Sequence, residues 1–240
     1  MDQIEPVFNN YLIDRLPDVR GALVPNGGLA DQSWFRVGGP AEVLFRPADP
    51  DDLSYFLTHC PADVPVTVLG AASNVLIRDG GIPGVVIRFS PAFAFVKVES
   101  DGLHAGAAAI DLNVARTAQN IGIGGLEFLC GIPGTIGGGL RMNAGAYGRE
   151  FKDIVFMVHV VERNGTRRTL TNEQVGFSYR AVKVPESTIF VSALLQGSES
   201  DPDVIQDRMR EIQKKRRETQ PIGEKTCGST FANPENDLQG

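Results

Sequence analysis

The sequence predicts an α+β protein in which two units of strands and helices each contain one glycine-rich loop. Strand-like and helix-like segments alternate to about residue 90 and again to about residue 200. The loops are residues 69–81 and residues 130–148. Glycine is favoured where a backbone takes a positive φ or comes close to another group. We therefore expect both loops to hold one dinucleotide.

Composition excludes several classes of protein. The 240 residues suffice for one large or two modest domains, and 42% hydrophobic residues can form a core. A net charge of −6 argues against nucleic acid or membrane as partner, and no apolar run approaches the roughly 20 residues of a membrane span. The N-terminus lacks the order of a signal peptide. Three distant cysteines and three histidines predict a cytoplasmic protein without disulfide scaffold or metal site.

The first unit is expected to run strand, helix, strand, loop, strand. Residues before about 30 are interpreted as a weak helix near 8–15 followed by loop. The alternating strand 42–47 ends at a proline, and Asp49 is the expected N-cap of an amphipathic helix that reaches residue 60. Apolar strands are expected at 66–69 and 85–89. The first glycine-rich loop thus begins at the end of a buried strand.

The second unit is expected to begin with a hairpin, in which strands 95–99 and 103–107 flank a Ser-Asp-Gly turn. The stretch 130–148 is interpreted as loop, because it is too rich in glycine for a helix or a strand interior. The other expected elements are a helix at 111–120, strands at 154–161, 168–170 and 189–196, a short capped helix from 171, and an amphipathic helix at 201–220.

Neither loop has the spacing of a common nucleotide-binding motif. The run Gly70-Ala71-Ala72-Ser73-Asn74 can offer successive N–H groups to a pyrophosphate. It lacks the Gly-x-Gly-x-x-Gly of a Rossmann fold and the Gly-Lys-Ser/Thr of a P-loop. An ordinary strand-end turn is the alternative for this run, and a structural Ω-loop is the alternative for 131–139. Two such loops in one chain favour ligand binding.

Taken in order, the motifs resemble those of one enzyme family. They are Leu69-Gly-x-x-Ser-Asn, Asp79-Gly80-Gly81, Gly131-Ile-Pro-Gly-Thr-Ile-Gly-Gly138, Met142-Asn-Ala-Gly-Ala-Tyr-Gly148, Tyr179-Arg180 and Gly228-Ser229-x-Phe-x-Asn-Pro234. From about Phe35 to Pro234 the chain resembles the UDP-N-acetylenolpyruvoylglucosamine reductase family. The short run after Tyr179 resembles the smaller type, which lacks an extra tyrosine-bearing loop.

The resemblance implies the FAD-binding fold of the vanillyl-alcohol oxidase type. Residues 1–90 and 91–200 are then the two α+β FAD-binding subdomains. Residues 201–240 begin an α+β substrate domain, whose remainder is expected to lie beyond this chain. A monomer is expected.

The resemblance also implies the chemistry. In the family, NADPH reduces non-covalently bound FAD, and a hydride then passes to the enolpyruvyl group of a UDP-sugar, giving UDP-N-acetylmuramate for peptidoglycan synthesis. Arg180 matches the arginine that stabilises charge on the substrate carboxylate, and Ser229 matches the proton donor. A surface ion pair and a turn serine are the alternatives. No residue matches the family's C-terminal catalytic glutamate, so we expect this chain to be impaired.

The remaining site residues are also assigned by resemblance. The FAD-binding residues are expected to be Arg36, Gly70, Ala71, Ala72, Ser73, Asn74, Gly131, Gly134, Thr135, Gly137, Gly138, Asn143 and Gly145. Tyr179 and Asn233 are expected to bind the substrate. Lys215 and Arg217 are candidates for a family lysine, with a solvated helix end as the alternative. Tyr147 either packs on the flavin domain or contacts substrate or nicotinamide.

Two other functions stay open. An FAD-dependent sugar or alcohol oxidase of the same fold would pass its electrons to O2. Such enzymes often tether the flavin through a histidine or cysteine near the first loop, and residues 70–74 contain neither. A non-catalytic nucleotide-binding module is the second alternative, and the motifs around Arg180 and Ser229 disfavour it.

Overall fold

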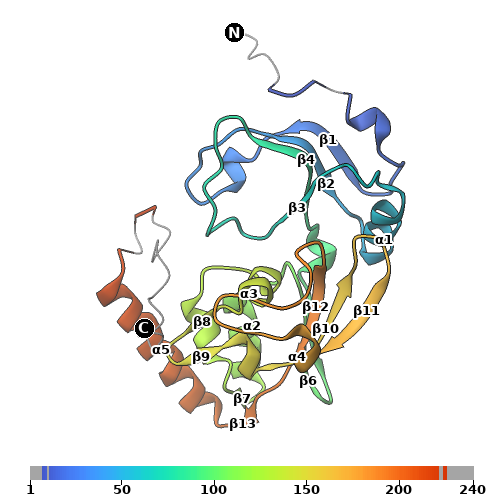
Figure 1. The fold of residues 1–240 in the computed structure, drawn as a ribbon. Coiled ribbons are helices and arrows are strands. Elements are labelled where there is room, and N and C mark those ends of the chain that lie inside the picture. Colours follow the sequence, from blue (N-terminus) through green and yellow to red (C-terminus); the bar gives the residue numbers. More distant parts are fainter. Residues whose placement is uncertain (1–6, 10, 222–223, 226–240) are drawn as a thin grey trace.

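Two larger β-sheets organise the computed structural model, which describes residues 7–9, 11–221 and 224–225 (Figure 1). The upper sheet in Figure 1 has the order β1-β2-β4-β3. Its strands are β1 (Ala22–Gly27), β2 (Ala41–Arg46), β3 (Val66–Leu69) and β4 (Ile82–Arg88). β1 runs antiparallel to β2, whereas β2 and β3 run parallel to β4. The loop between β3 and β4 is the first glycine-rich loop.

Helix α1 (Pro50–His59) packs against the first sheet and begins as predicted. The side chain of Asp49 accepts a hydrogen bond from the Asp52 amide at 2.9 Å, and a proline stands in the first turn. The buried carboxylate of Asp52 accepts three further bonds, from the amides of Arg20, Gly21 and Ala48. One acidic side chain therefore joins the start of the helix to the chain that leads into β1.

The second sheet has the order β11-β10-β12-β6-β5, and its neighbouring strands are antiparallel. Its strands are β5 (Val96–Glu99), β6 (Gly102–Gly106), β10 (Val155–Val161), β11 (Arg167–Thr171) and β12 (Ile189–Leu195). The central strand β12 is buried along its whole length, which explains its continuous apolar run.

Short elements connect the sheet to its helices. The helices are α2 (Asp111–Asn120), α3 (Ile136–Met142), α4 (Asn172–Val175) and α5 (Pro202–Thr219). The two-residue strands are β7 (Ile123–Gly124), β8 (Gly145–Ala146), β9 (Arg149–Glu150) and β13 (Ser198–Glu199). The 3₁₀ turns are η1 (Ile13–Arg15), η2 (Ala30–Gln32), η3 (Pro91–Phe93), η4 (Glu127–Gly131) and η5 (Phe151–Asp153).

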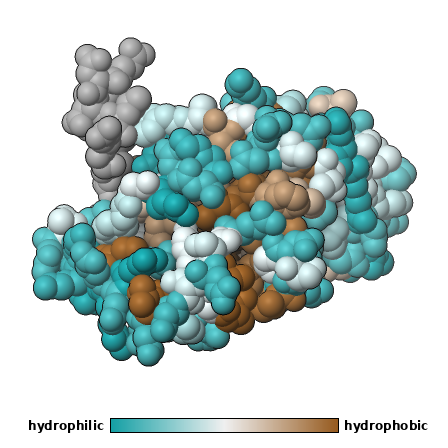
Figure 2. Space-filling model, turned by 90° about the horizontal axis from the view of Figure 1, so that it is seen from below, coloured by the Kyte–Doolittle hydropathy of each residue, from teal (hydrophilic) through white to brown (hydrophobic). Residues whose placement is uncertain are grey.

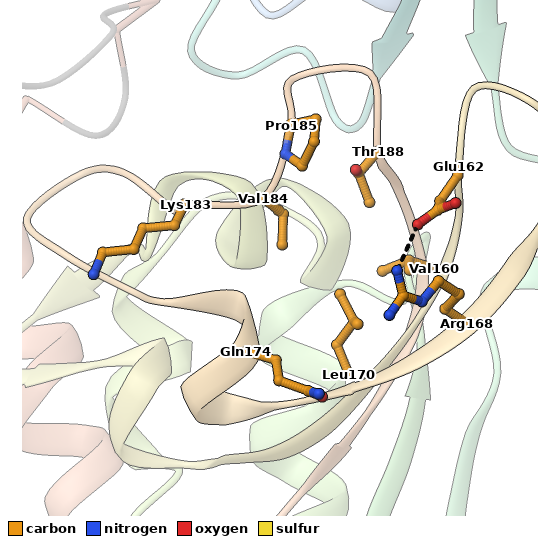
Figure 3. Close-up of a pocket in the computed structure, with 9 residues that line it drawn as sticks. All are labelled: Val160, Glu162, Arg168, Leu170, Gln174, Lys183, Val184, Pro185 and Thr188. Atoms are coloured by element: carbon orange, nitrogen blue, oxygen red, sulfur yellow. Dashed lines mark hydrogen bonds and ion pairs between the residues drawn. The ribbon is translucent and has the colours of Figure 1, made fainter.

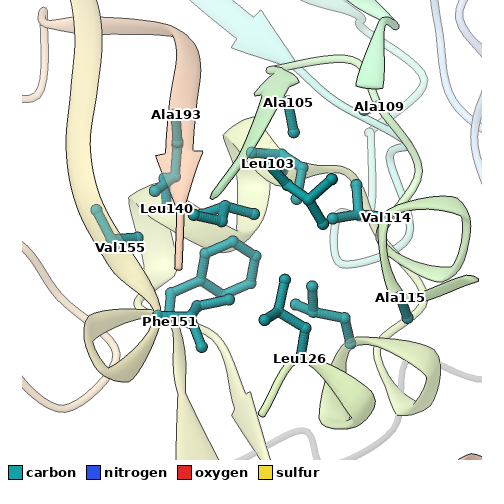
Figure 4. Packing of buried hydrophobic residues seen from close by; sticks show 14 of the residues in the cluster. Leu103, Ala105, Ala109, Val114, Ala115, Leu126, Leu140, Phe151, Val155 and Ala193 are labelled. Atoms are coloured by element: carbon teal, nitrogen blue, oxygen red, sulfur yellow. The ribbon is translucent and has the colours of Figure 1, made fainter. Parts of the chain in front are cut away.

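One large core fills the space between the second sheet and its helices. The ring of Phe151 lies at its centre, near Leu140 and Leu126 (Figure 4). Ile205 and Met209 of α5 belong to the same core. A second core lies between the two sheets, where Phe45 and Phe56 of the first unit meet residues of the second. Those residues of the second unit are Phe93, Val161, Ile189 and Val191. The two sheets therefore share apolar packing.

The expectation of loop throughout 130–148 is wrong, because α3 occupies part of that stretch. A side chain at Gly139 would overlap the ring of Phe151, and one at Gly137 would come within 3.0 Å of Ala107. Glycine inside a helix costs about 1 kcal/mol relative to alanine, and here it allows the helix to pack closely. Glycine density argues against a helix through backbone freedom alone, and it does not reveal the close packing that glycine allows here.

The segment before β2 also differs from expectation. Among the described residues near 8–15 the structure has the short turn η1 rather than a helix. Residues expected as loop form β1, although its sequence includes Pro25, Asn26 and Gly27. β1 is an edge strand, and an edge tolerates such residues. The other predicted strands and helices are confirmed to within a few residues, and the bounds of β3 and α2 agree with the prediction.

The surface of the described residues carries both hydrophobic and hydrophilic side chains. From below, hydrophobic patches are separated by hydrophilic side chains (Figure 2). Within the described part of the chain, no helix combines the length and the hydropathy needed to cross a membrane.

Candidate functional site

The two glycine-rich loops lie against each other. The first loop leaves β3 at Gly70, and the hydroxyl of Ser73 donates a hydrogen bond to the carbonyl of Pro133 in the second loop. A Cβ on Gly70 would lie 2.7 Å from Thr135 Oγ1. Glycine at position 70 therefore lets the two loops meet. The structure thus brings the predicted residues of 70–74 together with those of 131–135.

The second loop is fixed to the segment between β6 and α2. The amide of Asp111 donates to the Gly134 carbonyl at 3.2 Å. The amides of Ile136 and Gly137 donate to the carbonyls of Ala109 and Ala107, at 3.0 and 2.8 Å. These bonds hold the first turn of α3 in place, so the loop before it is a rigid part of the second unit.

Protein packing explains most glycines of the second loop, but it does not explain Gly138. A Cβ on Gly131 would approach the Tyr147 ring to 2.6 Å, and one on Gly145 would approach the Arg149 carbonyl to 2.7 Å. At Gly138 the nearest described atom would be Thr135 Oγ1 at 3.9 Å, and the residue is exposed. A helical glycine facing open space fits the close approach of a ligand.

Three buried side-chain oxygens beneath this loop have no hydrogen-bond partner among the described residues. They are both carboxyl oxygens of Asp111 and the hydroxyl of Thr135. Such unpaired groups cost about 1–3 kcal/mol each, so buried polar atoms normally have a partner. Burial raises the pKa of the Asp111 carboxyl well above its usual range. Burial therefore favours the protonated form of the carboxyl, which is able to donate a hydrogen bond as well as accept one.

Large apolar side chains are exposed on both loops and on the segments beside them. Leu76 and Trp34 are 71% and 43% exposed on the side of the first loop, and Trp34 donates its amide to the Ala72 carbonyl at 3.2 Å. Ile110 and Tyr147 are 51% and 42% exposed on the side of the second loop. A ligand with aromatic rings would cover such side chains. Together with the open face at Gly138 and the orphaned oxygens, they fit FAD.

Left-handed backbone conformations gather at the same place. Among the described non-glycine residues, positive φ occurs at Asn26, Arg36, Ala72, Asn143, Tyr147 and Arg180. All but Asn26 belong to segments predicted for the site, and for Tyr147 among them the sequence left alternative roles open. Each such residue costs about 1–3 kcal/mol, and this kind of strain clusters at functional sites.

A tight turn carries Arg180. Ser178 and Ala181 exchange backbone hydrogen bonds of 2.9 and 3.2 Å, and Tyr179 and Arg180 lie between them. Arg180 takes a φ of 55°, and its guanidinium carbon lies 5.6 Å from the centre of the Tyr179 ring. The ring contact limits the directions that the exposed guanidinium can take.

Asn143 differs from the other predicted FAD-binding residues, because its side chain is fully buried and bonded to protein. Its amide contacts Glu150, Lys152 and the Ser178 carbonyl. Ser229 and Asn233 lie outside the described residues.

Sequence reasoning missed the unpaired oxygens of Asp111 and Thr135. An aspartate after the apolar run 107–110 was the signal, and it was interpreted only as the start of α2.

A separate hollow of about 300 Å³ lies between β10, β11, α4 and the chain before β12 (Figure 3). An ion pair of 3.0 Å between Glu162 and Arg168 crosses its wall. None of the residues predicted for the site lines it. The glycine-rich loops, rather than this hollow, therefore define the candidate site.

Comparison with known proteins agrees with this fold. Residues 41–171, just over half of the chain, match a family described as an FAD binding domain. A cholesterol oxidase from B. sterolicum superposes with a TM-score of 0.55 at 16% identity, covering 77% of this chain and 39% of that one. The latter likeness concerns the fold alone. The fold and the site define an FAD-dependent oxidoreductase, and FAD is its cofactor.

Relatives with higher sequence identity to this chain show which family of FAD-dependent oxidoreductases it belongs to. A UDP-N-acetylenolpyruvoylglucosamine reductase from Parvibaculum lavamentivorans is 54% identical over 224 residues, which are 93% of this chain and 72% of the relative. The crystal structure of the reductase (MurB) from Thermus caldophilus superposes with a TM-score of 0.78 at 30% identity, over 91% of this chain and 77% of that one. The chain belongs to the UDP-N-acetylenolpyruvoylglucosamine reductase family.

Proposed function

We propose that the protein reduces UDP-N-acetylglucosamine enolpyruvate to UDP-N-acetylmuramate, with NADPH as hydride donor, for peptidoglycan synthesis in the cytoplasm. Membership of the reductase family supports this assignment of the reaction. The observation that carries the proposal here is the link between cofactor loop and cation. Asn143 follows the helix of the second glycine-rich loop and is hydrogen-bonded at 2.9 Å to Ser178, which begins the Arg180 turn. This bond supports the proposal that a cation acts beside the cofactor site.

The proposed cofactor contacts follow from the exposed parts of both loops. Backbone N–H groups of 70–74 suit the pyrophosphate, since Gly70, Ala71 and Asn74 are exposed at the end of β3. The open backbone of Gly138 allows a flat ring to approach. Arg36 is exposed on the segment that is bonded to the first loop through Trp34. We propose that FAD is held without a covalent bond.

The proposed chemistry divides between two side chains. When bound, FAD supplies the hydride, once NADPH has reduced it. Negative charge then develops on the carboxylate of the enolpyruvyl group, and Arg180 stabilises it with a planar guanidinium. The neighbouring carbon needs a proton, and Ser229 donates it. A serine is a weak acid, and the strongly basic carbon of such an enolate is an acceptor that it can protonate.

Substrate binding is assigned to Tyr179 and Asn233. Residues 1–90 and 91–200 are proposed as the two FAD-binding subdomains, and residues 201–240 as the start of the substrate domain. The separate sheets support the first division, whereas Ile205 and Met209 tie α5 to the large core between the second sheet and its helices. We propose that the protein acts as a monomer on a small UDP-sugar.

Flavin absorbance in stopped flow tests the function. In the full-length protein under anaerobic conditions, NADPH should bleach the bound flavin, and the enolpyruvyl UDP-sugar should restore its colour. Reduced flavin that the sugar nucleotide leaves bleached would contradict the proposal. Return of the colour with O2 but not with the sugar nucleotide would favour an oxidase.

A further inference from the structure

We propose that Asn143 is a positioning residue that holds Arg180 at a fixed place relative to the cofactor loop. The inference rests on the function proposed above and concerns a buried side chain whose three hydrogen-bond partners are all protein groups, although the sequence predicted it to bind FAD. An asparagine amide has two N–H donors and one carbonyl acceptor, so one buried side chain is able to tie three segments together.

The amide of Asn143 uses both donors and its acceptor. Nδ2 donates to the Ser178 carbonyl at 2.9 Å and to Glu150 Oε2 at 3.0 Å, while Oδ1 accepts from the Lys152 amide at 3.0 Å. The residue is 0% exposed. Lys152 Nζ lies 2.6 Å from the same Glu150 oxygen, so the carboxylate has a counter-ion. Only one orientation of the amide satisfies all three partners.

One end of this connection is the cofactor loop. Asn143 follows the last residue of α3 in a left-handed conformation, with φ 39° and ψ 52°. The next amide, that of Ala144, donates to the Gly139 carbonyl at 2.9 Å and completes the end of the helix. Asn143 is thus joined without a break to the helix that contains Gly138.

The other end is the turn of Arg180. Ser178 is the first residue of that turn, and its carbonyl accepts both from the Ala181 amide at 3.2 Å and from Asn143. The Lys183 amide donates to Val175 and Gly176, which fixes the chain on both sides of the turn. Arg180 itself is in a strained conformation, so it depends on its surroundings to stay there. Loss of the Asn143 side chain removes the hydrogen bond that anchors Ser178, the first residue of the turn.

Two variants separate the side chain from the backbone. Asn143→Gly keeps the left-handed conformation, which glycine adopts readily, and removes all three side-chain bonds. Asn143→Asp keeps the shape but turns an oxygen toward the Glu150 carboxylate and the Ser178 carbonyl. Asn172→Ala is the matched control. Asn172 also bridges two backbone carbonyls, those of Lys152 and Val155 at 2.7 and 2.8 Å, without contacting the turn.

The test measures each half-reaction of the full-length, FAD-loaded protein. We expect both Asn143 variants to be reduced by NADPH at the wild-type rate and to be reoxidised by the enolpyruvyl UDP-sugar about tenfold to a hundredfold more slowly, the size of effect that misplacement of a reacting group produces. Asn172→Ala should match the wild type in both steps. Asn143→Gly should add no further loss to Arg180→Ala. Hydrogen exchange of the Ala181 amide should quicken in Asn143→Gly but not in Asn172→Ala.

Several results would overturn the proposal. Equal slowing of both half-reactions by Asn143→Gly, together with weaker FAD binding, would make the residue merely structural. Losses that multiply in the double variant with Arg180→Ala would show that the two residues act independently. Unchanged exchange at Ala181 would remove the physical link even if activity fell. Wild-type protein that NADPH reduces but the sugar nucleotide does not reoxidise would overturn the proposed function as well, and would be recognised before any variant is made.

Discussion

The two glycine-rich loops are alike in composition but use glycine for different purposes. In the first loop the chain stays irregular, Gly81 takes a φ of 71°, and the buried Ala72 has a left-handed conformation. In the second loop the glycines from 131 to 145 lack a positive φ, and Gly148 at its end takes one of 77°. They instead allow close packing and a short helix. Glycine density in a sequence thus reveals a need for glycine without revealing which of its two properties is used.

The largest expected effect concerns Asp111, on which the second loop rests and which has no counterpart in the first. The folded pKa of this buried carboxyl is raised, so the unfolded chain ionises first as pH increases. Between the two pKa values the wild type should lose about 1.4 kcal/mol of stability per pH unit, a loss that Asp111→Asn should not show. Chemical denaturation of both proteins from pH 4 to pH 8 measures the difference. Parallel pH profiles would mean that the carboxyl has another partner.

A smaller loss is expected for Gly137→Ala, which tests close packing in the second loop. The added methyl would meet Ala107 at 3.0 Å, and we expect the free energy of unfolding to fall by about 1–2 kcal/mol. Thermal and chemical unfolding measure this loss. An unchanged stability would show that α3 is able to move away from the segment before α2.

The neighbouring change, Gly138→Ala, should act in the opposite direction on stability. No described atom lies within 3.9 Å of the added methyl, and alanine favours a helix over glycine by about 1 kcal/mol, so the protein without FAD should become more stable. FAD affinity should fall, because the methyl projects where the cofactor approaches. Quenching of Trp34, the single tryptophan of the chain, reports binding. Undiminished affinity would place the cofactor elsewhere.

The smallest effect is expected in the first loop, where backbone conformation rather than packing matters. Ala72→Gly should stabilise the protein by about 0.5 kcal/mol, because relief of the left-handed conformation exceeds the entropy cost of glycine. Ala71→Gly, at a position without positive φ, should instead destabilise it by about 0.5–1 kcal/mol. A shift of the same sign in both variants, measured by thermal unfolding, would contradict the contrast between the loops.

Much of the fold follows from local patterns in the sequence. β3 and α2 were predicted residue for residue, because an apolar run before a glycine and an amphipathic stretch bounded by Asp111 and Gly122 are unambiguous. β1 was missed, since a proline and a glycine at its end hide an edge strand. α3 was missed because the partners that make its glycines useful, Ala107 and Phe151, are distant in sequence.

The candidate site shows the same limit. Motifs were enough to select the residues of both loops, and the structure brings these together. Motifs did not reveal the left-handed conformation of Arg180, nor the hydrogen bond that joins the first residue of its turn to Asn143, 35 positions earlier in the chain. They also gave no sign of the unpaired oxygens of Asp111, since burial of a carboxyl is a property of the folded chain.

The first sheet does not complete its own core, and this has a consequence for how the protein is made. Its strands end at Arg88, yet Val161, Ile189 and Val191 lie in the core beneath it. During synthesis about a hundred further residues must therefore be added before these covering side chains exist. At about 5–20 residues per second this is a delay of about 5–20 seconds. Over that time Phe45 and Phe56 lack part of their final packing. A nascent chain halted before β12 should accordingly need a chaperone more than one released after it.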